Sequence, residues 1–330
     1  MAESYRPQQK RPLKLQMKIA KQLTELIGTT PLLSLERYSR EAGLGIPLVA
    51  KLEMKNPGGS AKDRAALSMI TSALSEGKLQ RGGTIIEPTS GNMGVALAWI
   101  ASSMGLKAII VMPDTMSRER RDLIRAYGAE LRLSSGKEGM AGAVALAEHI
   151  CRETPGSVIL GQFDNPNNPE AHARTTALEI WNDTDGTVDV LVAGVGTGGT
   201  ISGTGRTLKQ LNASIHVVAV EPAASPLLSE GHSGPHQLQG IGANFVPKNY
   251  DASCVDEVIT VADDDALRAA RRLAATEGLL AGISSGAALD AATRLARRDG
   301  FRGKRIVVIL PDTGERYLST HEFDFDNYPL

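Results

Sequence analysis

Hydrophobic and polar residues follow two repeating patterns along most of the chain. Short apolar runs, typical of strands, alternate with longer segments in which apolar residues recur three and four positions apart, as in helices. Strands are predicted at residues 47–52, 84–87, 107–112, 130–133, 158–160, 188–193, 216–220 and 304–310. Helices are predicted at residues 18–26, 61–75, 92–104, 118–127, 139–152, 169–181, 198–211, 263–276 and 285–297. The repeated order of strand, helix and strand indicates parallel sheets in an α/β fold.

Two segments lack either pattern. Residues 1–15 are polar and basic, and we expect them to form a flexible tail. Residues 222–250 form an irregular stretch that is long for a compact domain unless it is functional or contains short elements. A chain of 330 residues is long enough for about two domains. We place a smaller N-terminal α/β domain at 46–160 and a larger one at 16–45 together with 161–330.

Composition and charge narrow the classes of function. A hydrophobic content of 42% supports a large core, and a net charge of −1 argues against a surface for nucleic acids. Cys151 and Cys254 form no CxxC pair and are too few for a disulfide framework, so we expect buried thiols in a reducing cytoplasm. No apolar run reaches the roughly 18 residues of a membrane helix, and no signal peptide follows the start. Neither a membrane, a nucleic acid nor a metal is therefore a predicted partner.

A lysine at the start of a predicted helix is the strongest candidate for chemistry. Residues 56–59 are Asn-Pro-Gly-Gly, which favours a turn, and Ser60 suits the N-cap position of the helix that follows. Lys62 falls in the first turn of this helix, where the helix dipole disfavours a cation. The strand at 47–52 ends just before it, and ligands bind at the carboxyl ends of parallel strands. An ordinary surface lysine is the alternative. A lysine shielded from water near a helix N-terminus has a depressed pKa, which suits Schiff-base chemistry with a carbonyl cofactor.

Two further junctions of strand and helix suit an anion. The turn at residues 89–92 offers hydroxyl and backbone N–H groups, although an ordinary helix cap explains it equally well. Residues 194–199, Gly-Val-Gly-Thr-Gly-Gly, match the dinucleotide fingerprint, and the next strand ends in Glu221, so an NAD-dependent dehydrogenase is a competing hypothesis. Hydride transfer would leave Lys62 without a role.

Eight sequence blocks occur in a characteristic order along nearly the whole chain. They are Ile27-Gly-Thr-Thr-Pro-Leu32, Lys55-Asn-Pro-Gly-Gly-Ser-Ala-Lys-Asp-Arg64, Glu87-Pro-Thr-Ser-Gly-Asn92, Gln162-Phe-Asp-Asn-Pro166, Gly194-Val-Gly-Thr-Gly-Gly-Thr200, Gly234-Pro-His-Gln-Leu-Gln-Gly-Ile-Gly242, Ala281-Gly-Ile-Ser-Ser-Gly286 and Gly314-Glu-Arg-Tyr-Leu318. Together they resemble the cysteine synthase (O-acetylserine sulfhydrylase) family of fold-type-II pyridoxal 5'-phosphate enzymes. The resemblance implies two three-layer α/β domains, like those of the tryptophan synthase β chain, with the cofactor in the cleft between them.

The resemblance also implies which residues form the site. The implied cofactor-binding residues are Lys62, Asn92, Gly196, Thr197, Gly198, Gly199, Thr200 and Ser284, and the implied substrate-binding residues are Thr89, Ser90, Gly91, Asn92, Met93, Gln162 and Gly240. Lys62 is the implied covalent anchor, general base and later proton donor. Residues 196–200 hold the phosphate, Asn92 contacts the phenolic oxygen, and Ser284 contacts the pyridine nitrogen. A helix N-cap is the alternative role for Ser284.

The implied activity is β-replacement. O-acetyl-L-serine and sulfide give L-cysteine and acetate through an α-aminoacrylate intermediate. The family further implies a homodimer and, in some members, binding of the C-terminal tail of serine acetyltransferase. A catalytically idle family member is a third hypothesis, against which the joint presence of Lys62, Asn92, Gln162 and Ser284 argues.

Met93 departs from the threonine that most cysteine synthases carry at this position. The plant β-cyanoalanine synthases, which resemble cysteine synthases throughout, carry methionine there. The runner-up activity is therefore cysteine plus cyanide giving cyanoalanine and sulfide. Ala193 and Thr197 resemble the cysteine synthase branch instead, so we expect dominant cysteine synthesis with a cyanide side reaction.

Overall fold

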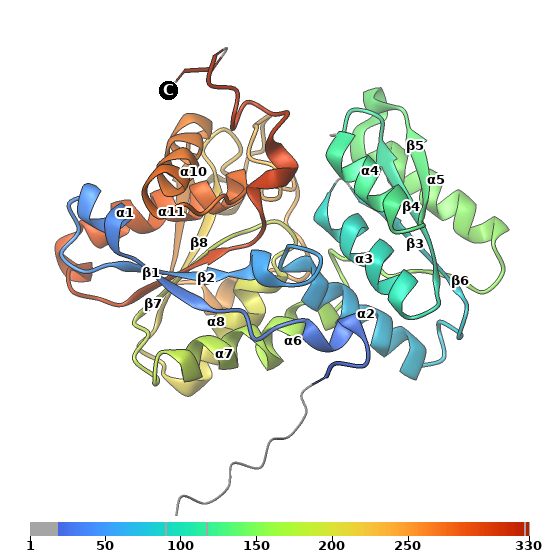
Figure 1. Ribbon diagram of the computed structural model, residues 1–330, viewed down its shortest axis with the longest axis horizontal. Coiled ribbons are helices and arrows are strands. Elements are labelled where there is room, and N and C mark those ends of the chain that lie inside the picture. The colour runs from blue at the N-terminus through green and yellow to red at the C-terminus, as the bar shows by residue number, and fades with distance from the viewer. Residues whose placement is uncertain (1–18, 90, 117, 327, 330) are drawn as a thin grey trace, which may run out of the picture.

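The computed structural model describes residues 19–89, 91–116, 118–326 and 328–329. The predicted tail at 1–15 and the candidate residue Ser90 lie outside this part of the chain. Figure 1 shows two lobes, each built around a sheet. No helix of the described residues is long and apolar enough to cross a membrane.

The larger sheet has six strands. In spatial order they are β1 (Leu32–Leu35), β2 (Leu48–Leu52), β10 (Ile306–Leu310), β7 (Val190–Gly194), β8 (His216–Pro222) and β9 (Glu257–Val261). Only β1 runs antiparallel to its neighbour. β7, β8 and β10 are apolar almost throughout, because both faces of a parallel sheet are covered by helices.

Helices cover both faces of this sheet. One apolar cluster joins it to α1 (Glu36–Glu41), α10 (Asp263–Glu277) and α11 (Ile283–Ala296). A second cluster joins the opposite face to α7 (Thr176–Asp183) and α8 (Gly199–Leu211). The layers are therefore helix, sheet and helix, as predicted for an α/β domain.

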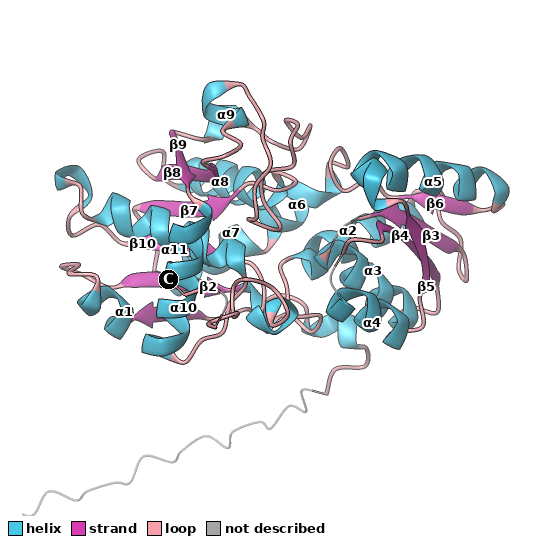
Figure 2. Cartoon of the chain, turned by 90° about the horizontal axis from the view of Figure 1, so that it is seen from above, coloured by secondary structure: helices cyan, strands magenta, loops and turns pink. Residues whose placement is uncertain are grey.

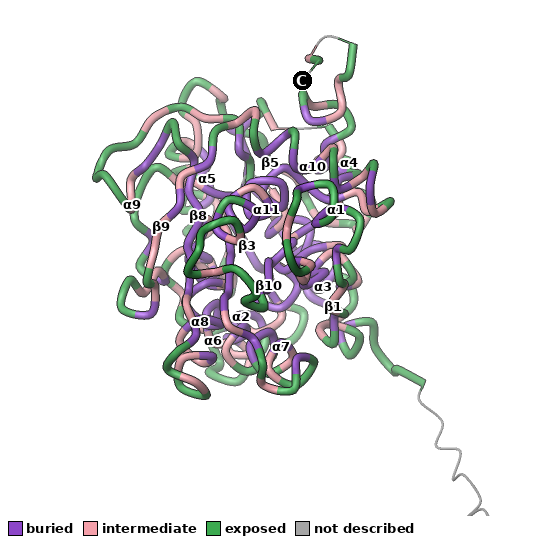
Figure 3. The backbone as a smooth tube through the Cα atoms, turned by 90° about the vertical axis from the view of Figure 1, so that its left-hand side faces the viewer, coloured by how far each residue is buried: buried purple, intermediate pink, exposed green. Residues whose placement is uncertain are grey.

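The smaller sheet has four parallel strands. Their order is β5 (Glu130–Ser134), β4 (Lys107–Pro113), β3 (Thr84–Pro88) and β6 (Ser157–Ile159). An apolar cluster joins the sheet to α2 (Lys62–Ser75), α3 (Asn92–Ser103) and α4 (Arg118–Ala126), and a small separate cluster lies under α5 (Gly139–Glu153). Figure 2 shows α5 on one side of the sheet and α3 and α4 on the other. Figure 3 shows buried backbone concentrated in the strands and the helices that pack on them.

The structure confirms most of the predicted elements and corrects several. Within the described residues, the helix predicted at 18–26 is only a 3-10 turn, Leu23–Leu26. The helix predicted at 169–181 is two helices, α6 (Asn167–Arg174) and α7, because the backbone of Thr175 is non-helical. The strands and α-helices of the described chain that were not predicted are β1, α1, β9 and, within the irregular stretch, α9 (Leu227–Glu230).

The division into domains stays a prediction. It assigns residues 46–160 to the smaller domain, yet β2 pairs with β1 and β10 in the six-stranded sheet. α2, which follows β2 in the chain, contacts both α3 and α6. The chain thus passes from the larger sheet to the smaller one through the helix that begins with Lys62.

Candidate active site

Five strands lead, at their carboxyl ends, into segments that carry candidate site residues. β2, β10 and β7 are neighbours in the larger sheet, and they lead into the turn before Lys62, the segment at 311–317 and the glycine-rich loop. In the smaller sheet, β3 leads into the turn at 89–92 and β6 leads to Gln162. Ligands bind where parallel strands end, so the topology supports one site there.

Lys62 is the first residue of α2, as predicted. Ala61 occupies the N-cap position in place of the predicted Ser60, whose hydroxyl instead accepts the Lys62 N–H at 3.3 Å. The Lys62 side chain is half-buried, and Nζ makes no hydrogen bond or ion pair with any described residue. Burial lowers the pKa of Lys62, and the Asp312 carboxylate partly opposes that change. A lysine of lowered pKa without a structural partner is suited to nucleophilic chemistry.

The turn at 89–92 begins α3, with Gly91 at the N-cap position. Thr89 is buried, and its hydroxyl accepts the Gly91 N–H at 3.3 Å. The Asn92 side chain is fixed at both ends: Nδ2 donates to Asp312 Oδ2 at 2.6 Å, and Oδ1 accepts from Arg316 Nη1 at 2.7 Å. Met93 is 1% exposed and belongs to the apolar cluster of the smaller sheet. Its side chain therefore acts on the site through packing.

The glycine-rich loop follows β7 and opens α8. Gly198 has a φ of +80°, which a residue with a side chain rarely adopts. A Cβ added at Gly199 would lie 2.0 Å from Asn168 Oδ1, so no larger residue fits. The first N–H groups of a helix have no intrahelical partner, and with the nearby hydroxyls they form an anion site. This loop fits the phosphate group that the resemblance implies.

Two residues of α6 hold the hydroxyls of this loop. Asn168 Nδ2 donates to Thr197 Oγ1 at 3.0 Å and to the Gln162 carbonyl at 2.8 Å, which joins the loop to the segment after β6. The His172 ring lies between Thr176 and Thr200, with Nε2 3.2 Å from Thr200 Oγ1. Burial lowers the pKa of His172 to about 3, so the ring is neutral.

Gln162 is buried, and Glu87 fixes its backbone. The Glu87 carboxylate accepts the N–H groups of Leu160, Gly161 and Gln162 at 3.0–3.1 Å. Burial raises the pKa of Glu87 to about 7 against these hydrogen bonds. Gln162 is thus fixed on one side by Glu87 and is linked through Asn168 to Thr197 of the glycine-rich loop.

Ser284 and Gly240 lie close to each other, although they are far apart in the sequence. Ser284 is buried in the first turn of α11, where Gly282 is the N-cap residue, so the alternative role of Ser284 as a helix cap is wrong. A Cβ added at Gly240 would lie 3.6 Å from Ser284 Oγ, and one added at Gly196 would lie 2.2 Å from the Gly240 carbonyl oxygen. The irregular stretch therefore touches both the glycine-rich loop and the start of α11.

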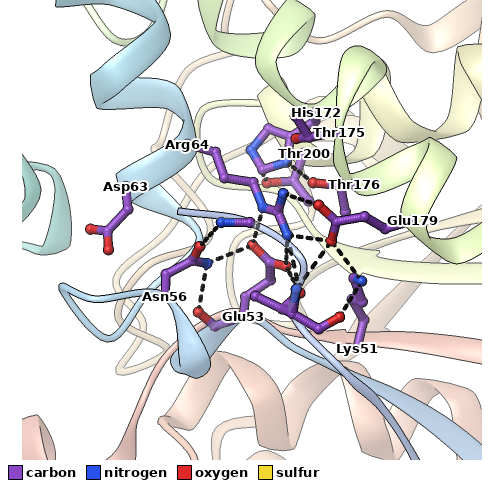
Figure 4. A network of polar contacts seen from close by, with 12 residues as sticks. Lys51, Glu53, Asn56, Asp63, Arg64, His172, Thr175, Thr176, Glu179 and Thr200 are labelled. Carbon is purple, nitrogen blue, oxygen red and sulfur yellow. Dashed lines mark hydrogen bonds and ion pairs between the residues drawn. The ribbon is translucent and has the colours of Figure 1, made fainter. Parts of the chain in front are cut away.

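A buried ionic network fixes the helix that carries Lys62 (Figure 4). Arg64 Nε and Nη2 bind the Glu53 carboxylate at 2.7 and 2.8 Å, and Nη1 and Nη2 bind Glu179 at 2.7 and 2.8 Å. Lys51 adds an ion pair to Glu179 at 2.8 Å. Burial favours a raised pKa of Glu53, but the Arg64 guanidinium outweighs it and holds the pKa below its usual value. The first turn of α2 is thus attached to the 3-10 turn Glu53–Lys55, which follows β2, and to α7.

The competing dinucleotide hypothesis conflicts with the position of Glu221. This carboxylate is buried and accepts the N–H groups of Leu228 and Ser229 at 2.7 and 3.0 Å. A ribose-binding carboxylate has to face the ligand, whereas Glu221 is occupied by the start of α9.

Sequence reasoning missed Asp312, Arg316, Asn168, His172 and Glu87. Asp312 and Glu87 lie at or just beyond the carboxyl ends of parallel strands, which is a positional signal readable from the chain. Asn168 and His172 lie in the helix whose break at Thr175 was not predicted. Nothing in their local pattern distinguishes them from solvated helix residues.

Comparisons with known proteins agree with this geometry. The family model described as pyridoxal-phosphate dependent enzyme matches residues 23–312. A cysteine synthase of Staphylococcus aureus is 49% identical over 306 residues, which cover 92% of this chain and 97% of that protein. The solved cysteine synthase of Entamoeba histolytica is 41% identical with a TM-score of 0.90, covering 97% of this chain and 94% of that one. A solved hydrogen sulfide-producing enzyme of Fusobacterium nucleatum is 43% identical with a TM-score of 0.87, covering 91% of this chain and all of that one. The chain therefore belongs to the pyridoxal-phosphate dependent enzymes, within the family of the cysteine synthases.

Proposed function

We propose that this protein is a pyridoxal-phosphate dependent cysteine synthase that converts O-acetyl-L-serine and sulfide to L-cysteine and acetate. The observation that carries the proposal is the half-buried Lys62 of lowered pKa, at the start of α2 and without a structural partner in the described chain. The glycine-rich loop at the start of α8, which also follows the carboxyl end of a strand, offers a site for the cofactor phosphate.

Lys62 is the proposed anchor of the cofactor and the proposed base. Pyridoxal phosphate, when bound, withdraws electrons from the substrate Cα and so makes loss of the β-acetoxy group possible. Nζ removes the Cα proton and later returns a proton to the product. A lowered pKa leaves more of the amine neutral at physiological pH, as both attachment and proton removal require.

The remaining residues bind and orient. We propose that Thr89, Ser90, Gly91, Asn92 and Gln162 hold the substrate carboxylate, that residues 196–200 hold the cofactor phosphate, and that Gly240 lies near the substrate amine. Ser284 offers a neutral hydroxyl to the pyridine nitrogen. Such a neutral donor leaves the ring a weaker electron sink, which favours β-elimination over reactions that need a persistent carbanion.

Reductive trapping tests the role of Lys62. The purified chain loaded with pyridoxal phosphate is reduced with borohydride and mapped by mass spectrometry, and the pyridoxyl adduct is expected on Lys62. The Lys62→Ala variant should fold, because alanine suits a helix, yet lose the adduct and turnover. Lys51→Ala is a poor control because Lys51 is buried in an ion pair, whereas Lys248→Ala removes a lysine whose side chain is 82% exposed and should change nothing. An adduct on another lysine would refute the assignment.

A second candidate activity concerns the nucleophile. Met93 replaces the usual threonine, and the Fusobacterium nucleatum relative is a hydrogen sulfide-producing enzyme. We therefore propose a minor reaction of cysteine with cyanide that yields cyanoalanine and sulfide. Product analysis with O-acetylserine, O-phosphoserine and cysteine, each against sulfide and cyanide, ranks the activities. A higher catalytic efficiency for cysteine plus cyanide than for O-acetylserine plus sulfide would reverse the order proposed here.

The homodimer, the serine acetyltransferase tail and the cytoplasmic location remain proposals from the resemblance. Sedimentation of the purified chain tests the first of these, and binding of a peptide with the serine acetyltransferase C-terminus tests the second.

A further inference from the structure

Asp312 is a buried carboxylate that joins several parts of the proposed site. It follows β10 and is 1% exposed. Its Oδ2 accepts two hydrogen bonds, from Asn92 Nδ2 and from the Tyr317 hydroxyl, each at 2.6 Å. The carboxylate thus restrains Asn92, which the proposed function places against the cofactor and the substrate.

The second oxygen of Asp312 is buried without a hydrogen bond. Oδ1 has no such partner among the residues that the structure describes. A Cβ added at Gly282 would lie 2.3 Å from it, so Oδ1 packs against the backbone where α11 begins, two residues before Ser284. A buried carboxylate with an unsatisfied oxygen is costly unless an opposite charge lies close by.

The turn before Lys62 lies beside the segment that carries Asp312, because the two segments are hydrogen-bonded along their backbones. The Ala61 N–H donates to the Pro311 carbonyl at 2.8 Å, and the Thr313 N–H donates to the Gly59 carbonyl at 3.2 Å. Ser60 and Asp312 form a bridge between these bonds. The Asp312 carboxylate also opposes the lowering of the Lys62 pKa by burial.

We propose that Asp312 is a positioning residue of this active site: its carboxylate is the counter-charge that holds a proton on Lys62 Nζ, and it orients the Asn92 amide. This inference rests on the proposed role of Lys62. When Nζ takes the substrate Cα proton, the N–H bond that forms creates an ammonium ion beside a fixed carboxylate. The proton then stays on Nζ until it is returned to the product.

Other charged and titratable groups surround the pair. Tyr317 and Glu322 face Asp312 from the C-terminal segment; burial raises the pKa of Tyr317 far above its ordinary value and the pKa of Glu322 to about 9, so both are neutral near pH 7. Arg316 donates hydrogen bonds to Asn92 and to the Gly58 carbonyl. The guanidinium carbon of Arg120, in α4, lies 4.9 Å from the centroid of the Tyr317 ring. His172 faces Lys62 and is neutral, so Asp312 is the charged group that opposes the lowering of the Lys62 pKa.

The test measures Lys62 in the chain freed of cofactor. Trace labelling of amines with acetic anhydride over a range of pH, read by mass spectrometry of the Lys62 peptide, gives the apparent pKa of Nζ. The exposed Lys248 serves as an internal standard. Asp312→Asn and the smaller Asp312→Ser both remove the charge, and each should lower the apparent pKa of Lys62. Asp299→Asn removes a carboxylate whose side chain is 93% exposed and should leave it unchanged.

Two outcomes would overturn the inference. One is an unchanged or raised apparent pKa of Lys62 in a folded Asp312 variant, with folding checked by circular dichroism. The other is an equal lowering in Asp299→Asn. Because the labelling uses no cofactor, it can fail while borohydride still traps the cofactor on Lys62, and the trapping can fail while the labelling succeeds.

Discussion

Some residues of the candidate site can be predicted from the sequence around them, whereas others are recognised only by contacts with distant parts of the chain. Lys62, Gly198 and Gly199 occupy junctions of strand and helix, and such junctions are readable from hydrophobic pattern and turn chemistry. Asp312 and Arg316 contact Asn92 across more than two hundred residues of sequence. No local pattern predicts a contact between residues so far apart in the sequence. The hydrogen bonds that hold the Asn92 side chain are therefore seen only in the structure.

Met93 shows how burial changes the meaning of a sequence departure. The resemblance places Met93 among the substrate-binding residues, whereas its side chain is 1% exposed in the apolar cluster. Met93→Thr should therefore lower the free energy of unfolding by about 1–3 kcal/mol, because it buries a hydroxyl in place of an apolar side chain. Denaturant unfolding measures this loss.

The same variant tests specificity. We expect Met93→Thr to raise the ratio of catalytic efficiencies for O-acetylserine plus sulfide over cysteine plus cyanide. Met69→Thr is the matched control, since Met69 is fully buried in the same cluster but lies on α2, away from the 89–92 turn. It should cost similar stability and leave the ratio unchanged. An unchanged ratio in Met93→Thr would remove this residue from the choice of nucleophile.

At the scale of elements, the sequence predicts the long, strongly patterned segments and misses the short ones. Nearly every predicted strand and helix exists, with ends displaced by a few residues. β1 and α9 have four residues each, too few to show a period. The break at Thr175 was missed because threonine is tolerated within helices, and its non-helical φ and ψ are seen only in the structure.

The attachment of α2 to the 3-10 turn Glu53–Lys55 and to α7 depends on one guanidinium. Arg64→Met leaves the buried Glu53 carboxylate without its main partner, and breaking a buried pair in this way costs about 3–5 kcal/mol. Urea unfolding measures the loss. Arg125→Met removes an exposed partner of Asp122 and should cost less than about 1 kcal/mol. The double variant Arg64→Met/Glu53→Gln should recover part of the loss, and failure to recover any would show that packing of the Arg64 stem dominates.

Among the described residues, Glu87 and Glu322 are buried carboxyl groups whose ionisation opposes folding. Burial raises the pKa of Glu87 to about 7 and that of Glu322 to about 9, against 4.5 for an ordinary glutamate. A carboxyl group with a raised pKa binds its proton more tightly in the folded state than in the unfolded state. Its contribution to stability is therefore full below pH 4.5 and falls as the pH rises to the folded pKa. Between about pH 7 and pH 9, the Glu87 contribution no longer changes with pH, whereas the Glu322 contribution still falls as the pH rises.

Glu322→Gln isolates that effect. Both carboxyl oxygens of Glu322 lack hydrogen-bond partners in the described chain, so the amide replaces no hydrogen bond. Wild-type protein should lose thermal stability between pH 7 and pH 9, and the variant should lose less. Asp299→Asn, at an exposed carboxylate, should follow the wild type. Parallel curves for Glu322→Gln and wild type would show that Glu322 ionises normally.

The position of β10 in the larger sheet has a consequence for synthesis on the ribosome. β10 begins at Ile306, yet it lies between β2 and β7, which are made much earlier. A nascent chain that has not reached β10 has two unpaired strand edges facing each other, and Lys62 lies in a segment whose backbone partners, Pro311 and Thr313, do not yet exist. Unpaired edges are sites of wrong association, so the nascent chain is exposed to it during this interval. Lys62, the proposed catalytic residue, is thus held in place only after residues 311–313 have been made.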